Sequence, residues 1–161
     1  MASDPSVSPV FVRSSVDIAA SDRVVWAVLA DIGSWPTWNP AIRQSDFDAE
    51  LEVGARFSFL TSSGSLRCQL VAVDAPRILA WSGRLMTVRH RQSWTVDARP
   101  HGCRASLAAS ADGLAARIFR GRMIEQFTEE VSTTLELLRL EAETRSSEAT
   151  GSAEGRASTR G

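Results

Sequence analysis

The chain has 161 residues, a formal net charge of −1, and 43% hydrophobic residues. This length suits one domain with its own core, and the near-neutral charge gives no long-range attraction to nucleic acid or to an anionic membrane. No apolar run in the sequence approaches the roughly 20 residues that span a bilayer, so stable membrane insertion is not expected.

Composition also limits the chemistry. The chain contains no lysine and no tyrosine, which excludes a Schiff base on the chain and a phenol as an acid. Cys68 and Cys103 are too few and too far apart to indicate a disulfide framework or a zinc site, and no metal or cofactor motif is present. The first residues lack the basic and apolar regions of a secretory signal. We therefore expect a cytoplasmic protein without metal or cofactor, either a monomer or a homodimer.

The two ends differ in composition from the rest of the chain. Residues 1–8 are rich in Ser and Pro and are expected to be flexible, and residues 146–161 carry no large apolar side chain and are expected to be disordered. One domain should therefore cover residues 9–145. It begins with a β-branched strand at 10–18 and a helix at 21–33, for which Ser21 is a suitable N-cap.

The helix is followed by "SWPTWNP", which places two tryptophans three residues apart. Ser34 can cap a single helical turn, Pro36 fits its first turn, and Pro40 ends it. Trp35 and Trp38 then share one face. They either close one end of the core or line a ligand entrance, and the two roles are compatible.

Alternation with period two then predicts a run of strands joined by short turns. They cover residues 42–50, 55–63, 66–74, 77–83, 88–98 and 103–111. Consecutive short strands indicate an antiparallel meander and argue against βαβ units.

The last element is a long helix from about Leu114 to Glu143, with Gly121 as a candidate bend. It carries one continuous apolar stripe, made of Ile124, Phe127, Val131, Leu135 and Leu138. Such a stripe needs an apolar surface to lie on, and a curled sheet supplies one. The predicted fold is therefore α+β, a helix grip: a curved antiparallel sheet of about seven strands wrapped around the long C-terminal helix, with two short helices after the first strand.

Strand parity identifies the side chains that face this helix. The predicted inward set is Phe57, Phe59, Leu79, Trp81, Trp94 and Val96, with His90 and Gln92 as its polar members. Small-molecule pockets are typically apolar with a few placed hydrogen-bonding groups. We therefore expect ligand contact from this set, joined by Phe119 and Met123 on the long helix, where core packing is the other interpretation.

His90 is the candidate catalytic residue, because the ordinary pKa of histidine suits proton transfer at neutral pH. The alternative is a structural histidine between Arg89 and Arg91. The arginines at the start of the long helix, Arg117, Arg120 and Arg122, either meet an acidic ligand group or pair with helix carboxylates.

Four segments carry a resemblance to a known family. They are "VDIAASDRVVWAVLADIGSWPTWNPAI", "PRILAWSG", "RQSWTVDARPHGCRASLAAS" and "LELLRLEAE". Together they resemble the START-like, helix-grip superfamily (SRPBCC), and within it the polyketide cyclase/dehydrase branch, over about Val10 to Glu143. The resemblance implies a cavity between sheet and helix. The family strand often carries a histidine two places before its aromatic residue, where this chain has Gln92.

The sequence leaves a choice of functions. The first expectation is that the chain binds a small hydrophobic or aromatic ligand, lipid-like or polyketide-like, as a carrier or sensor. The second is that it binds such a ligand as a cyclase/dehydratase, which holds a reactive chain in a near-attack geometry. A third interpretation is a filled core that acts through a partner surface.

Overall fold

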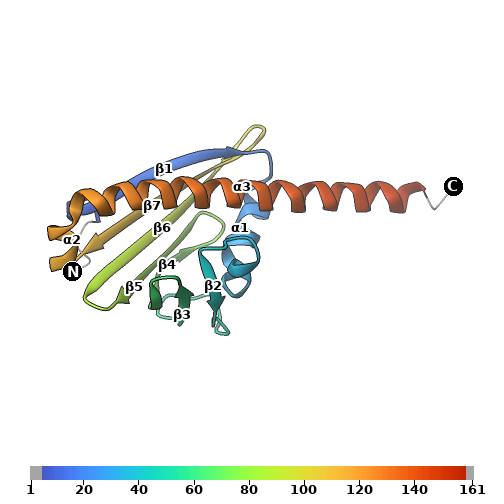
Figure 1. Ribbon diagram of the computed structural model, residues 1–161. Coiled ribbons are helices and arrows are strands. Elements are labelled where there is room, and N and C mark those ends of the chain that lie inside the picture. The colour runs from blue at the N-terminus through green and yellow to red at the C-terminus, as the bar shows by residue number, and fades with distance from the viewer. Residues whose placement is uncertain (1–4, 159–161) are drawn as a thin grey trace.

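The computed structural model describes residues 5–158, which form a curled sheet gripping one long helix (Figure 1). The strands are β1 (Val10–Ile18), β2 (Ile42–Ser45), β3 (Arg56–Thr61), β4 (Gly64–Asp74), β5 (Ile78–Leu85), β6 (Val88–Arg99) and β7 (Gly102–Asp112). The helices are η1 (Pro5–Val7), α1 (Asp22–Ala30), η2 (Ile32–Thr37), α2 (Leu114–Ile118) and α3 (Arg120–Ser158). This element order confirms the predicted helix-grip fold.

The strands form one 7-stranded sheet in the order β1-β7-β6-β5-β4-β3-β2. Every neighbouring pair is antiparallel. The chain therefore builds a meander from β2 to β7, and β1 joins it at the β7 edge. Figure 1 shows α3 lying across the inner side of this sheet, with α1 below α3 and next to β2.

The first helix is set by its local sequence. The side-chain oxygen of Ser21 accepts a hydrogen bond from the backbone N–H of Val24 at 3.3 Å. Ser21 is therefore the N-cap of α1, as predicted. The helix buries Val25, Val28 and Leu29 and ends at Ala30.

The turn after α1 differs from the prediction. It is the 3-10 helix η2, and Ser34 lies inside it instead of capping it, with Asp31 at the cap position. The backbone N–H of Ser34 donates to the carbonyl of Asp31 at 3.0 Å, while Thr37 Oγ1 donates to the carbonyl of Ser34 at 2.7 Å. The backbone N–H of Ser34 already takes part in the first i to i+3 hydrogen bond, so Ser34 lies inside the helix.

The C-terminal helical region has a break at Phe119, two residues before the expected bend at Gly121. Phe119 is the C-cap of α2, and α3 begins at the next residue, Arg120. The side chain of Arg120 donates to the carbonyl of Pro9 at 2.8 Å. The buried stripe of α3 follows the predicted spacing. Its fully or nearly buried members are Phe127, Val131, Leu135, Leu138 and Ala142.

The end of α3 also differs from expectation, because the structure continues the helix to Ser158 where disorder was expected from residue 146. After the apolar stripe stops, the alanine, glutamate and arginine residues of this segment favour a helix, whereas its serines and glycines weaken one. Arg145 pairs with Glu141 at 2.7 Å, and Thr150 Oγ1 donates to the carbonyl of Ser146 at 3.1 Å. Figure 1 shows this part of α3 projecting beyond the sheet.

The predictions for the two ends of the chain can be compared with the structure only in part. Residues 1–4 and 159–161 lie outside the described residues, and residues 5–7 of the expected flexible start form η1. Within residues 5–158, no helix is both long enough and apolar enough to cross a membrane.

Candidate ligand cavity

A cavity of about 420 Å³ lies between α3 and the inner side of the sheet. Its walls come from the segment after η2, from β3 and the β3–β4 turn, from β5, β6 and β7, and from α3. This volume falls within the range of small-molecule sites. This space between the sheet and α3 argues against the filled-core interpretation.

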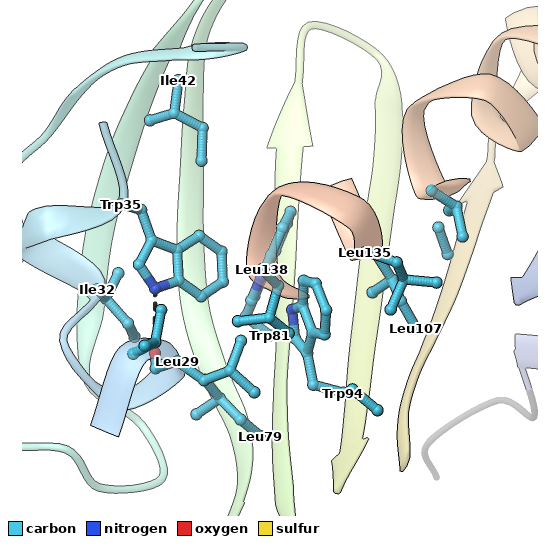
Figure 2. Close-up of a cluster of buried hydrophobic side chains, with 14 of the residues drawn as sticks. Leu29, Ile32, Trp35, Ile42, Leu79, Trp81, Trp94, Leu107, Leu135 and Leu138 are labelled. Atoms are coloured by element: carbon cyan, nitrogen blue, oxygen red, sulfur yellow. Dashed lines mark hydrogen bonds between the residues drawn. The ribbon is translucent and has the colours of Figure 1, made fainter. Parts of the chain in front are cut away.

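Aromatic rings form the apolar wall of the cavity. Trp35 stacks on Phe59 with ring centroids 5.4 Å apart, and Phe59 meets Trp81 edge to face at 5.9 Å. All three line the cavity. Figure 2 shows Trp35 reaching from η2 toward the sheet and Trp81 lying beneath α3. Rigid rings supply a large apolar contact area at a low cost in side-chain entropy.

The two tryptophans of "SWPTWNP" have different surroundings. Trp35 is buried and lines the cavity, and its indole Nε1 donates to the carbonyl of Leu29 at 3.0 Å (Figure 2). Trp38 is buried next to it, with ring centroids 5.7 Å apart, but lies outside the cavity lining. Trp35 therefore both fills the end of the core and lines the cavity, whereas Trp38 fills the core.

The predicted site residues divide into two groups. Those that line the cavity are Trp35, Phe59, Trp81, His90 and Gln92. Those that do not are Trp38, Phe57, Leu79, Trp94, Phe119 and Met123. Parity placed the strand residues on the correct face, since Phe57, Leu79 and Trp94 are buried. Other side chains pack over these three residues and separate them from the cavity. Strand parity does not predict such contacts, because they depend on residues far away in the sequence. Phe119 is instead exposed, and Met123 packs at the edge of the core.

His90 is half-buried in the cavity wall on β6. Its imidazole stacks on the ring of Phe127 from α3, with centroids 5.8 Å apart and planes at 26°. Burial lowers its pKa below the ordinary histidine value, because the protonated ring loses hydration there. The imidazole is therefore neutral at physiological pH, as a general base must be.

Glu130 is a polar cavity residue that the sequence analysis did not select. It projects from α3 one turn after Phe127, and desolvation by the surrounding protein raises its pKa. Its side chain is solvent-exposed at the open side of the cavity. The available signal was its spacing: Glu130 and Thr134 follow Phe127 by 3 and 7 residues, on the edge of the apolar stripe.

One cavity residue has an unmet hydrogen bond. The indole Nε1 of Trp81 is buried and has no hydrogen-bond partner. Gln92 lies directly opposite Trp81 on the neighbouring strand β6 and also lines the cavity. A buried N–H without a partner costs about 1–3 kcal/mol.

The thiols and acidic groups form no obvious reactive centre. Cys68 and Cys103 are free and buried, and burial raises their thiol pKa values to about 12 and about 11. Both are therefore protonated packing residues at neutral pH. Among the described residues, no group of three or more His, Cys, Asp or Glu side chains is placed to hold a metal ion.

A curled seven-stranded sheet packed around a long helix, with a cavity between them, defines a helix-grip, START-like protein. Residues 9–143 match the family described as polyketide cyclase/dehydrase and lipid transport, and the chain belongs to this family. No curated protein matches the sequence.

Solved structures share the fold at low sequence identity. The aromatase/cyclase Zhui from Streptomyces sp. R1128 is similar with a TM-score of 0.71 and 18% identity, covering 84% of this chain and 94% of that one. A hypothetical protein from Helicobacter pylori has a TM-score of 0.74 and 17% identity, with 86% and 90% covered. A START superfamily protein from Mycobacterium smegmatis has a TM-score of 0.61 and 16% identity, with 86% and 98% covered.

Proposed function

We propose that this protein binds a small hydrophobic or aromatic molecule, lipid-like or polyketide-like, in the cavity between α3 and the sheet. The observation that carries the proposal is the cavity itself, about 420 Å³ in volume, with an aromatic wall and polar groups on its other sides. The family and the fold of the aromatase/cyclase neighbour support the same ligand class. The free thiols favour the cytoplasm as the place of binding.

The polar groups suggest how a ligand would be oriented. Gln92 and His90 line the cavity and favour a ligand with a polar group such as a carbonyl, since both side chains can form hydrogen bonds. The aromatic wall would then hold the apolar part of the ligand.

A pair of cavity variants tests binding. Ala109 is buried on β7 and lines the cavity, whereas its neighbour Ala108 lies on the other side of the strand, outside the lining. Ala109→Leu should reduce the volume and abolish ligand binding, and Ala108→Leu should not. A bound ligand at 100 times its dissociation constant stabilises the fold by about 2.7 kcal/mol, so a panel of fatty acids and aromatic polyketones is screened by thermal unfolding. A panel that stabilises neither the wild type nor Ala108→Leu contradicts the proposal.

A second candidate function is catalysis of cyclisation and water loss, and one observation favours it. His90 and Glu130 both line the cavity, where desolvation lowers the pKa of the imidazole and raises the pKa of the carboxyl. A neutral imidazole can remove a proton from the carbon beside a ketone. A protonated carboxyl can protonate the hydroxyl that departs as water.

Two substitutions separate the enzyme from the carrier. If the protein is an enzyme, His90→Ala and Glu130→Gln each lower turnover of an aromatic polyketone analogue by about 100-fold or more, while its binding persists. A carrier shows saturable binding and no wild-type turnover. Equal turnover by the wild type and both variants contradicts the assigned roles.

A further inference from the structure

Large apolar side chains are exposed together at one end of the sheet, which we name the apolar end. Its members are Val7, Met86, Leu114, Ile118 and Phe119, with exposed fractions of 79%, 86%, 71%, 64% and 58%. Single exposed apolar residues are ordinary, but a contiguous group on a protein surface marks an interaction site.

Three contacts bring these separate segments to the same end. Ser8 Oγ donates to Asp112 Oδ2 at 2.8 Å, which joins the start of β1 to the end of β7. Arg120 Nε donates to the carbonyl of Pro9 at 2.8 Å, which joins α3 to the same point. A Cβ on Gly113 would lie 2.8 Å from the carbonyl oxygen of Thr87, so the β5–β6 turn lies against the start of α2. Figure 1 shows α2 and the β5–β6 turn at the left end of the molecule.

Met86 is placed there at a cost to the fold. It lies in the two-residue turn between β5 and β6 with φ 53°, a backbone conformation that suits glycine and strains a bulky side chain. It is also almost fully solvent-exposed. Packing and turn geometry both favour another residue, so its presence points to a role outside the folded monomer.

The second unfavourable feature is a row of like charges. Arg67, Arg84 and Arg89 lie directly opposite one another on the adjacent strands β4, β5 and β6, and we name them the arginine row. All three are exposed. Like charges directly opposite each other destabilise a sheet. Arg84 and Arg89 flank the turn that carries Met86.

Further arginines continue this charge around the apolar end. Arg117, Arg120 and Arg122 are exposed on α2 and at the start of α3. Within residues 5–158, the ion pairs found at 4.0 Å or less involve neither these arginines nor the arginine row. The nearest acids are Asp112, which is bonded to Ser8 and lies directly opposite Arg89 on β7, and Glu125 on α3. The net charge of −1 therefore conceals a basic end.

We propose that the apolar end and the arginine row form a peripheral docking face for an anionic membrane surface. Apolar side chains at loop and short-helix positions can enter the headgroup layer, and the arginines beside them can pair with anionic lipid headgroups. A nucleic acid would leave the apolar end unused, and an acidic protein partner would not need such protruding tips. The docking face also borders the cavity, because Leu85 lines the cavity and directly precedes Met86.

Vesicle co-sedimentation tests the proposal directly. The wild type should bind phosphatidylglycerol-containing vesicles, should bind pure phosphatidylcholine vesicles much less, and should be released by salt. Phe119→Ser should lower the partition coefficient about tenfold. Arg84→Gln should lower it about fivefold at low salt.

Met86→Gly separates docking from folding. It removes both the strain and the apolar side chain, so it should unfold at the same temperature as the wild type or higher, yet bind vesicles about tenfold more weakly. Leu140→Ser and Arg23→Gln are the matched controls, because Leu140 on α3 and Arg23 on α1 are exposed and α1 follows the opposite end of β1. Their binding should equal that of the wild type.

Two results overturn the proposal. The first is no preference of the wild type for anionic vesicles, which leaves the face to an acidic protein partner. The second is equal loss of binding in the two control variants and the docking-face variants. Neither result bears on the cavity proposal, since vesicle binding is measured without a cavity ligand.

Discussion

Trp35 and Trp38 are both buried, but the hydrogen bonding of their indole N–H groups differs. Trp35 donates to the carbonyl of Leu29, whereas the Nε1 of Trp38 is buried without a partner. Trp35→Phe leaves that carbonyl unsatisfied and should lower the free energy of unfolding by about 1–3 kcal/mol. Trp38→Phe removes an unpaired donor and should cost less. Urea unfolding of the two variants measures the difference, and an equal or larger cost for Trp38→Phe would contradict the hydrogen-bond account.

The pKa of His90 predicts a pH dependence of stability. Burial lowers this pKa in the folded state, so the unfolded chain binds more protons once the pH falls below the ordinary histidine value near 6.5. This contribution to stability is complete above about pH 6.5 and is lost as the pH falls below it. Between pH 7.5 and 5.5 the wild type should lose up to about 1 kcal/mol more than His90→Gln. Parallel pH profiles of unfolding free energy for the two proteins would refute the burial of this imidazole.

At the scale of elements, two glycines have opposite constraints. Gly102 begins β7 with φ 115°, and an added Cβ would lie 2.1 Å from the carbonyl oxygen of Ile18. Gly121 lies in α3 with nothing within 4 Å of its added Cβ. Gly102→Ala should therefore destabilise by more than about 2 kcal/mol, while Gly121→Ala should stabilise by about 0.5–1 kcal/mol. Thermal unfolding of both tests the hairpin geometry, which fails if Gly102→Ala melts like the wild type.

The projecting part of α3 has a separate prediction. We propose that residues 9–145 hold the folded domain, since the buried stripe ends at Ala142 and Figure 1 shows the later turns beyond the sheet. A chain ending at Arg145 should keep the melting temperature of the full chain within about 2 °C. A large loss of stability on this truncation would show that the projecting turns contribute to the fold.

At the scale of the whole molecule, local patterns predicted the architecture well. The alternation of Phe57 with Phe59 and of Trp94 with Val96 identified the inner face, and the stripe from Phe127 to Leu138 identified the helix that covers it. These patterns succeed because period and burial are coupled along a single element.

The details of the cavity required contacts between elements. Trp94 and Trp81 share the inner face, yet Trp94 is packed against Trp35 while Trp81 lines the open space. Glu130 was missed because a glutamate beside an apolar stripe is usually solvated, and its position over the cavity depends on where α3 crosses the sheet. The exposure of Phe119, the C-cap of α2, was missed for the same reason, since helical periodicity at Phe119 predicts burial.

The most direct test of the ligand cavity is a two-dimensional ¹⁵N–¹H spectrum of the indole N–H groups during ligand titration. The chain has 5 tryptophans, and Trp81→Phe assigns the signal of interest. The account predicts that the Trp81 signal shifts saturably with an aromatic ketone or a fatty acid, while the signal of Trp26 on α1, outside the cavity lining, stays in place. Shifts confined to Trp26, or no shift with any ligand of the panel, would contradict a ligand site in this cavity.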